Sequence, residues 1–204
     1  SGPSHAEEAG KGIPTTCVAG AHTRQTAEHI QNLFMSETFR VYTSPDVRGI
    51  EVGAALKNVI ALAAGIAGGL GYGDNARAAI ITRGIAEMAR LGAAMGCSKE
   101  TFSGLTGLGD LVVTCTSMHS RNNRAGILIG KGETPENAVK EVGMVVEGMN
   151  ALPAALELAE RYQVEMPIVQ TVNAIVNKGM GAAEAVKSLM ERGLKNELPQ
   201  GYEK

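Results

Sequence analysis

One lysine stands in a long stretch of small and apolar residues, and it is the first candidate for chemistry. Residues 49–71 are nearly all alanine, glycine or aliphatic, with Lys57 and Asn58 in the middle. The apolar positions recur at helical spacing, so we expect a buried helix over 49–70. On that helix no residue at i±3 or i±4 from Lys57 can pair with its charge. Such a lysine either extends to reach water or, kept from water, serves as a proton donor or acceptor.

A glycine-rich segment leads into the second candidate, Asp110. Residues 104–109 hold three glycines, and an apolar run follows from Leu111. One interpretation is a tight turn with Asp110 as the N-cap of the next helix. The other is a carboxylate held by the turn so that it orients a lysine or a substrate hydroxyl, with Thr114 one turn further on. The segment is not GxGxxG and follows no predicted strand, so it does not predict a dinucleotide fingerprint.

The third candidate is an anion site at residues 120–126. Ser120 is followed by Arg121, two asparagines and a second arginine at the expected start of a helix. A helix N-terminus presents free N–H groups, and arginine can hold a phosphate through two parallel hydrogen bonds. The alternative is a basic surface turn. Glu147, by contrast, is interpreted first as a negative charge at the start of a helix.

The composition argues against several classes of protein. The formal net charge is -2, aromatic residues make up 3% and tryptophan is absent, so we expect no nucleic-acid partner. Four histidines without ligand spacing predict no metal site. Three widely spaced cysteines favour a reducing, cytoplasmic location. The apolar run over 52–70 approaches membrane-spanning length, but its charge and its many small residues favour a core helix over a membrane span.

The elements that position these residues divide the chain into two unequal parts. Residues 15–19 and 39–43 read as short strands around a helix over 22–35, which cannot form a stable sheet alone. From residue 49 onward we expect only helices, and we interpret 195–204 as a loose tail. The expected helices cover 49–70, 74–95, 98–103, 110–116, 120–130, 134–141, 147–163, 166–178 and 181–192.

Seven motifs in one order resemble the bacterial NAD(P)-dependent glycerol-3-phosphate dehydrogenase family, and the resemblance covers essentially the whole chain. They are Ser-Gly-Pro-Ser-His-Ala at 1–6, Glu-Val-Gly-Ala-Ala-Leu-Lys-Asn-Val at 51–59, Gly-Asp-Asn-Ala-Arg-Ala-Ala at 73–79, Thr-Arg-Gly at 82–84, Gly-Leu-Thr-Gly-Leu-Gly-Asp-Leu at 104–111, Ser-Arg-Asn at 120–122 and Val-Glu-Gly at 146–148.

The resemblance implies a mainly α fold. Residues 1–48 would be the last strands and helix of a Rossmann (α/β) domain that binds NAD or NADP. Residues 49–204 would be a helical substrate-binding domain of the 6-phosphogluconate dehydrogenase-like type. We expect the chain to begin late in the Rossmann domain, without the Gly-rich pyrophosphate loop and without a second substrate-contacting lysine of the family. By itself the chain is then expected to be inactive.

The resemblance also implies an activity and roles for particular residues. The activity interconverts sn-glycerol 3-phosphate and dihydroxyacetone phosphate with NAD(P), and so supplies glycerol 3-phosphate for phospholipid synthesis. Lys57 matches the proton acceptor for the substrate hydroxyl, and Asp110 matches the acid that contacts substrate and orients the lysine. The expected substrate contacts are Gly2, Ser4, Lys57, Asn58, Asp110, Thr114, Ser120, Arg121 and Asn122. The expected cofactor contacts are Ala6, Arg121, Val145 and Glu147.

Two alternatives stay open. The first is another dehydrogenase that has the same helical domain and acts on a different hydroxy acid or sugar acid. A helical dimerisation module without catalysis of its own is the second alternative, because the apolar helices favour a homodimer.

Overall fold

The computed structural model describes residues 1–194 and 196–197, and its N-terminal part is a small α/β unit. A short helix, α1 (Ala6–Ala9), precedes β1 (Thr15–Gly20), α2 (Arg24–Phe34) and β2 (Phe39–Ser44). The two strands pair in parallel, with Thr15 opposite Phe39, and α2 makes the crossover between them. Most of the predicted loose tail lies outside the described residues.

The rest of the described chain is helical, as predicted, and it contains no strand after Ser44. Its elements are α3 (Val47–Gly69), α4 (Asp74–Ala94), α5 (Lys99–Ser103), the π-helical turn η1 (Leu105–Gly109), α6 (Asp110–Thr116), α7 (Arg121–Gly130), α8 (Pro135–Val142), α9 (Glu147–Arg161), α10 (Pro167–Lys178) and α11 (Ala182–Met190). The predicted mainly α fold class, with a small α/β part at the start, is therefore confirmed.

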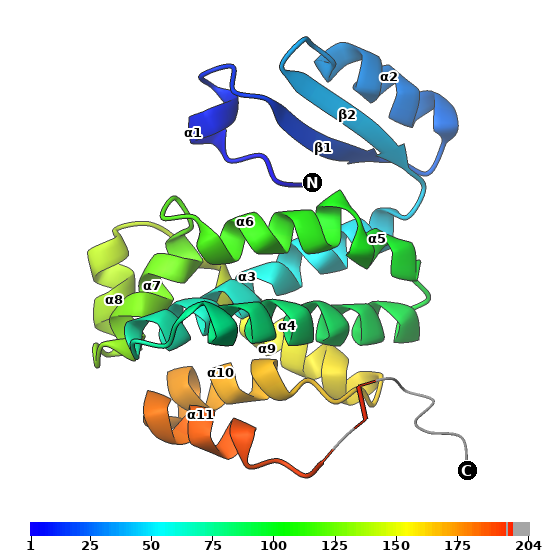
Figure 1. Cartoon of the computed structure of the whole chain (residues 1–204). Coiled ribbons are helices and arrows are strands. Elements are labelled where there is room, and N and C mark those ends of the chain that lie inside the picture. The colour runs from blue at the N-terminus through cyan, green and yellow to red at the C-terminus, as the bar shows by residue number, and fades with distance from the viewer. Residues whose placement is uncertain (195, 198–204) are drawn as a thin grey trace.

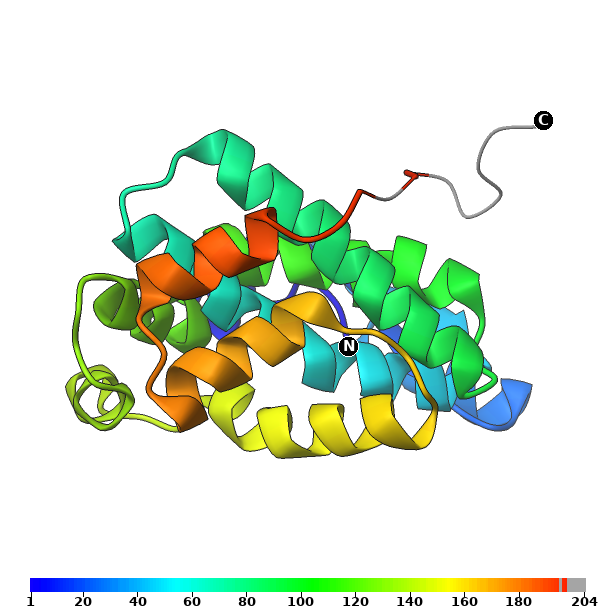
Figure 2. The ribbon, with the colours of Figure 1, turned by 90° about the horizontal axis from the view of Figure 1, so that it is seen from below.

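Helix α3 is the central element of the helical part. It contacts α4, α6, α7, α9 and α10, and Figure 1 shows it between the two strands at one end and α10 and α11 at the other. Seen from below, α10 lies between α9 and α11 (Figure 2). Asp46 begins α3 as its N-cap, because its carboxylate accepts the backbone N–H of Gly49 at 3.0 Å.

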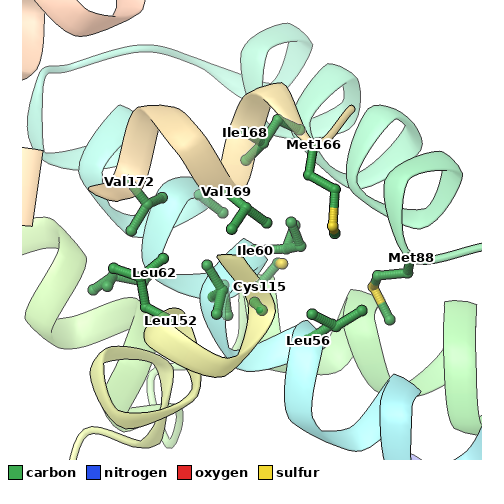
Figure 3. Packing of buried hydrophobic residues seen from close by; sticks show 14 of the residues in the cluster. Leu56, Ile60, Leu62, Met88, Cys115, Leu152, Met166, Ile168, Val169 and Val172 are labelled. Carbon is green, nitrogen blue, oxygen red and sulfur yellow. The ribbon is translucent and has the colours of Figure 1, made fainter. Parts of the chain in front are cut away.

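The core gathers around α3. Its side chains Leu56, Ile60 and Leu62 are fully or almost fully buried against residues from α4, α6, α9 and α10 (Figure 3). By length and composition α3 could cross a membrane, but about two thirds of its most apolar window is buried inside the protein. This burial is what a core helix requires.

Glycines allow α7 to lie unusually close to α3. A Cβ added at Gly65 would lie 2.2 Å from the carbonyl oxygen of Asn123, and one at Gly126 would lie 2.3 Å from that of Leu62. The same pattern repeats one turn along each helix. The small residues of the 49–70 stretch therefore bring the two backbones together.

A buried carboxylate from another helix caps the N-terminus of α10. The residue before this helix is Met166, which has no polar atom to cap the free N–H groups, and Glu87 of α4 accepts them instead. Its oxygens lie 2.8 Å from the nitrogen of Ile168 and 3.4 Å from that of Val169. Burial raises the pKa of the Glu87 carboxyl to about 7, against the lowering effect of these two hydrogen bonds.

Candidate functional site

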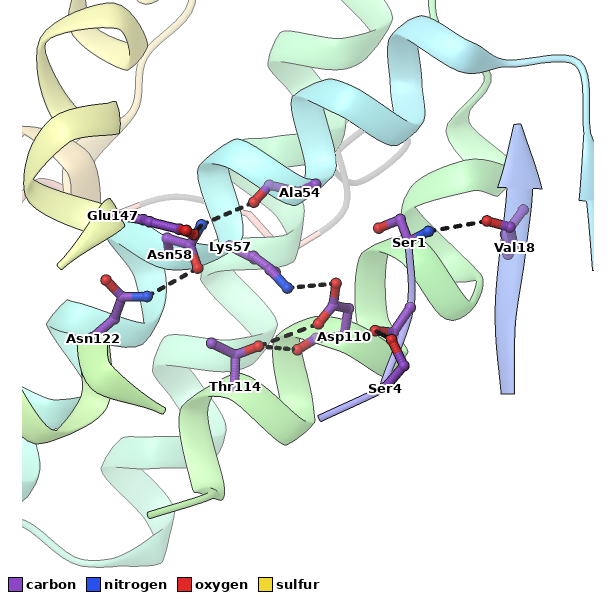
Figure 4. A network of polar contacts seen from close by, with 11 residues as sticks. Ser1, Ser4, Val18, Ala54, Lys57, Asn58, Asp110, Thr114, Asn122 and Glu147 are labelled. Atoms are coloured by element: carbon purple, nitrogen blue, oxygen red, sulfur yellow. Dashed lines mark hydrogen bonds and ion pairs between the residues drawn. The ribbon is translucent and has the colours of Figure 1, made fainter. Parts of the chain in front are cut away.

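The partner of Lys57 is Asp110, which lies 53 residues away in the chain. Lys57 Nζ donates to Asp110 Oδ2 at 2.6 Å, and the two side chains are 20% and 5% exposed (Figure 4). Since an ammonium group has three N–H donors and one is used here, two remain for a ligand. The buried Asp110 carboxylate therefore fixes the direction of the Lys57 side chain, and the partly exposed lysine remains accessible to a ligand.

The local structure before Asp110 differs from the predicted tight turn with an N-cap. Residues Leu105–Gly109 form a single π-helical turn that continues directly into α6, and Asp110 is the first residue of that helix. The Asp110 side chain caps no N–H, so the N-cap interpretation was wrong. Its carboxylate instead faces α3, where the ammonium group of Lys57 offers a stronger, charged donor.

Thr114 joins the same cluster from one turn further along α6. Its hydroxyl donates to the backbone carbonyl oxygen of Asp110 at 2.6 Å and lies 3.3 Å from the carboxylate Oδ1. The residue is buried, and Figure 4 shows it on the side of Asp110 away from Ser4. Lys57, Asp110 and Thr114 are therefore brought together, and the placing of Thr114 one turn after Asp110 was predicted from spacing.

A second cluster is built on Asn58, the residue after Lys57. Its amide nitrogen donates to the carbonyl oxygen of Ala54 at 3.0 Å and to Glu147 Oε2 at 3.3 Å. Its amide oxygen accepts from Asn122 Nδ2 at 2.9 Å, and Asn122 Oδ1 accepts the backbone N–H of Gly148 at 2.7 Å. The start of α9, the start of α7 and the middle of α3 are thereby joined (Figure 4).

The start of α7 has the predicted form. Ser120 is the N-cap, and its hydroxyl oxygen accepts the backbone N–H of Asn123 at 3.2 Å. The guanidinium of Arg121 lies 3.6 Å from Glu147 Oε1, and the arginine side chain is 35% exposed. Arg121 is therefore held on one side by a carboxylate and is accessible on the other.

The first residues of the chain lie beside the Lys57 pair. Ser1 exchanges backbone hydrogen bonds with Val18 of β1, and Gly2 is buried with φ at +139°. A Cβ at Gly2 would lie 3.0 Å from the Cα of Cys17, so only glycine fits this close approach. Ser4 is exposed, its hydroxyl donates to the carbonyl oxygen of Gly2 at 3.3 Å, and Figure 4 shows it next to Asp110.

Two of the residues expected to contact a cofactor offer surface rather than polar groups. Ala6 begins α1 and is exposed, and Val145 in the segment before α9 is 57% exposed. The structure joins neither of them to the Lys57 pair. Glu147 does belong to the second cluster, through Asn58 and Arg121.

Sequence reasoning missed three residues of this region. The ring of His5 lies edge-on to that of His119, with centroids 6.0 Å apart, and the buried His5 Nε2 has no hydrogen-bond partner among the described residues. Gly148 was missed because a glycine in the first turn of a helix has no side chain to signal a contact. The sequence held a weak signal for His5, because it lies between an expected substrate contact, Ser4, and an expected cofactor contact, Ala6.

A cavity of about 730 Å³ lies elsewhere, between α3, α4, α10 and α11. Its described lining is mostly aliphatic, with Glu87 and three arginines, and includes no predicted site residue. The cavity therefore does not mark the place where charged groups converge on Lys57.

Comparisons with known proteins agree on one family. Residues 46–187 match the model of the NAD-dependent glycerol-3-phosphate dehydrogenase C-terminus. The chain is 62% identical over 198 residues to glycerol-3-phosphate dehydrogenase (NAD(P)+) of Fusobacterium nucleatum, covering 97% of this chain and 59% of that protein. It is 57% identical over 198 residues to the Bacillus subtilis enzyme of the same name, covering 97% of this chain and 57% of that protein.

A solved structure shows the same fold. The crystal structure of glycerol-3-phosphate dehydrogenase from Coxiella burnetii aligns with a TM-score of 0.91 at 39% identity, over 94% of this chain and 59% of that one. The chain thus spans a little under 60% of the length of these relatives. It belongs to the NAD-dependent glycerol-3-phosphate dehydrogenase family, with residues 46–187 forming the family's C-terminal part.

Proposed function

We propose that this chain is the substrate-binding portion of an enzyme that interconverts sn-glycerol 3-phosphate and dihydroxyacetone phosphate with NAD or NADP. The product, glycerol 3-phosphate, would serve phospholipid synthesis. The proposal rests on the names of the relatives, and on one observation above all. The pair Lys57–Asp110 has its atoms 2.6 Å apart with the carboxylate buried, and an arginine-bearing helix N-terminus is nearby.

Lys57 is the proton-transfer group in this proposal. In the oxidation direction the neutral amine accepts the proton of the substrate's secondary hydroxyl as the O–H bond breaks and the carbonyl forms. In the reduction direction the ammonium group donates to the ketone oxygen, and before that it stabilises the negative charge that builds up there. Asp110 directs Nζ, and Thr114, through its contact with Asp110, limits how far the carboxylate can turn.

The start of α7 holds the substrate's phosphate in this proposal. Its free N–H groups and the accessible guanidinium of Arg121 suit a dianionic group. Asn122 has one amide N–H left after its bond to Asn58. Ser120 contributes mainly by fixing the first turn, since its hydroxyl oxygen already accepts a backbone N–H. Ser4 closes the other side, next to Asp110 (Figure 4), and its hydroxyl donates to the carbonyl oxygen of Gly2.

The residues expected near the cofactor fit a nicotinamide nucleotide in their chemistry. Exposed Val145 and Ala6 offer apolar surface for a planar ring, and Glu147 is an acceptor for hydroxyl groups. The guanidinium of Arg121 is the cation that would face a phosphate of the cofactor. The bound nicotinamide would supply hydride transfer. The residues of this chain then bind and orient the substrate, move its hydroxyl proton and limit the access of water.

An assay of the full-length gene product tests the function. The proposal predicts oxidation of glycerol 3-phosphate with NAD or NADP, and no comparable turnover of unphosphorylated glycerol. Turnover of a hydroxy acid or sugar acid in preference to glycerol 3-phosphate would favour the first alternative instead.

Arg121→Ala separates the same two activities. The proposal predicts that KM for glycerol 3-phosphate rises far more than KM for the cofactor, because the substrate's phosphate loses a charge-assisted hydrogen bond. Steady-state kinetics with each ligand varied in turn measures both constants. An equal loss for both ligands would count against the phosphate clamp at residues 120–122.

Three further assignments complete the proposal. Residues 1–48 belong to a nucleotide-binding domain and 49–204 to the substrate domain, with the boundary inside the first turn of α3. A cytoplasmic location agrees with Cys17, Cys97 and Cys115, which are all free thiols. A homodimer is the assembly expected from the apolar helices, and sedimentation velocity tests it.

A further inference from the structure

The two carboxamides of the second cluster can face only one way. The backbone N–H of Gly148 must donate, so the atom of Asn122 that lies 2.7 Å from it has to be the amide oxygen. The Asn122 amide nitrogen then faces Asn58, whose oxygen must accept. Both N–H groups of Asn58 are consequently directed away, to Ala54 and to Glu147.

This chain of hydrogen bonds ends on a carboxylate that faces an arginine. Glu147 Oε2 receives Asn58 at 3.3 Å, and Oε1 lies 3.6 Å from Arg121 Nη2. Glu147 is 55% exposed, so little packing restrains its side chain and the amide of Asn58 is its neutral anchor. The Gly148 N–H fixes the orientation of Asn122, Asn122 fixes that of Asn58, and Asn58 holds Glu147 beside the guanidinium of Arg121.

The hydrogen bond between Asn122 and the Gly148 N–H at the start of α9 also has a structural reason. The residue before α9 is Val146, which has no polar side chain to cap the helix, so Asn122 accepts the Gly148 N–H in its place. There is no room for a side chain at residue 148. A Cβ there would lie 2.5 Å from the carbonyl oxygen of Asn58 and 3.0 Å from Asn122 Oδ1.

We propose that Gly148, Asn122 and Asn58 form a positioning relay that holds Glu147, and through it the guanidinium of Arg121, in place for the phosphate of the substrate. Asn58 has no N–H left for a ligand, so its contribution runs through Glu147. The inference deepens the proposed function and rests on it for the identity of the ligand. It makes Gly148 and Asn58 determinants of substrate affinity rather than of proton transfer.

A double-mutant cycle between Asn58 and Glu147 tests the relay. KM for glycerol 3-phosphate is measured at saturating cofactor for Asn58→Ala, Glu147→Ala and the double variant of the full-length enzyme. We expect each single change to raise KM about tenfold, and the double change to raise it about as much as Glu147→Ala alone. kcat should change much less than KM. Effects that multiply to about a hundredfold would overturn the relay, because the two residues would then act independently.

Asn123→Ala is the matched control. Asn123 is as buried as Asn122 on the same helix, but its amide donates to the carbonyl oxygen of Cys115 and takes no part in the relay. Its loss should lower thermal stability and leave KM for glycerol 3-phosphate within about twofold of wild type. A tenfold rise in KM for this variant would show that any buried amide loss at this place weakens binding, and it would overturn the relay.

A second readout keeps the relay separate from the enzyme activity. Hydrogen exchange at the Gly148 amide, followed by nuclear magnetic resonance, should become about tenfold faster in Asn122→Ala, intermediate in Asn58→Ala, and unchanged in Asn123→Ala. Absence of wild-type turnover would remove the proposed function but not this measurement. Unchanged Gly148 exchange in both relay variants would overturn the relay itself.

Discussion

At the residue scale, the proposed chemistry depends on a lysine whose partner is remote in the chain. The helical pattern around Lys57 showed that no neighbour on its own helix could pair with it, and this is what made it a candidate. The identity of the partner could not be read from spacing, because Asp110 reaches it from another helix. Asp110 looked equally like an N-cap, and only the direction of its side chain separates the two roles.

Glu87 shows the opposite case, a buried charge with a structural task. It is 2% exposed, it caps α10 from α4, and the charged groups that face it are Arg90 and Arg192. Its raised pKa means that the folded protein holds a proton that the unfolded chain releases between pH 4.5 and about 7. The contribution of the protonated Glu87 to the free energy of unfolding is thus complete below pH 4.5 and is lost as the pH rises to about 7 and above.

Glu87→Gln should remove that pH dependence. The amide stays neutral and its oxygen can still accept the Ile168 N–H. The free energy of unfolding, measured with urea at pH 5 and at pH 7.5, is compared between wild type and variant. We expect the wild-type advantage to shrink by about 2–3 kcal/mol from the lower to the higher pH. A difference that is the same at both pH values would contradict the raised pKa.

At the element scale, one helix organises the site and two others begin in an unusual way. The capping of α7 by Ser120 and most helix positions were predictable, because they follow from local caps and from apolar spacing. The capping of α9 and α10 was not predictable, since Val146 and Met166 cannot cap and the accepting side chains, Asn122 and Glu87, come from other helices. The π-helical turn η1 was also missed, because a glycine-rich segment is compatible with many backbone paths.

The close contact between α3 and α7 predicts opposite outcomes for two glycines. Gly126→Ala should destabilise the protein by about 1–3 kcal/mol, because its Cβ would meet the backbone of α3. Gly68→Ala is the control, since its Cβ would lie 3.9 Å from the nearest atom, in Ile127. There alanine should stabilise by up to about 1 kcal/mol through its helix propensity. Thermal and urea unfolding measure both; equal effects would argue against the close contact.

At the scale of the whole molecule, the proposed function makes this chain one side of a site whose other side would be a nucleotide-binding part. It covers 59% of the F. nucleatum protein, and its α/β unit has only two strands. Residues that suit the substrate's phosphate and the proton transfer converge from α3, α6 and α7. The expected cofactor contacts Ala6 and Val145 are exposed, and no GxGxxG occurs in the chain.

This division predicts weak cofactor binding by the 204-residue chain alone. Titration with NADH, followed by nucleotide fluorescence, should show no saturation at micromolar concentrations, because the expected pyrophosphate loop is not among its residues. Full-length protein in the same titration is the positive control. Micromolar binding by the chain alone would mean that the nucleotide site has been assigned to the wrong part of the molecule.

The proposed proton-transfer role of Lys57 is tested by Lys57→Ala in the full-length enzyme. The measurement is kcat for glycerol 3-phosphate oxidation at saturating cofactor, with circular dichroism to establish that the variant is folded. We expect a loss of about 10²–10⁴-fold, the range that a positioned general acid–base group supplies. A folded Lys57→Ala enzyme with kcat close to that of the wild type would contradict it.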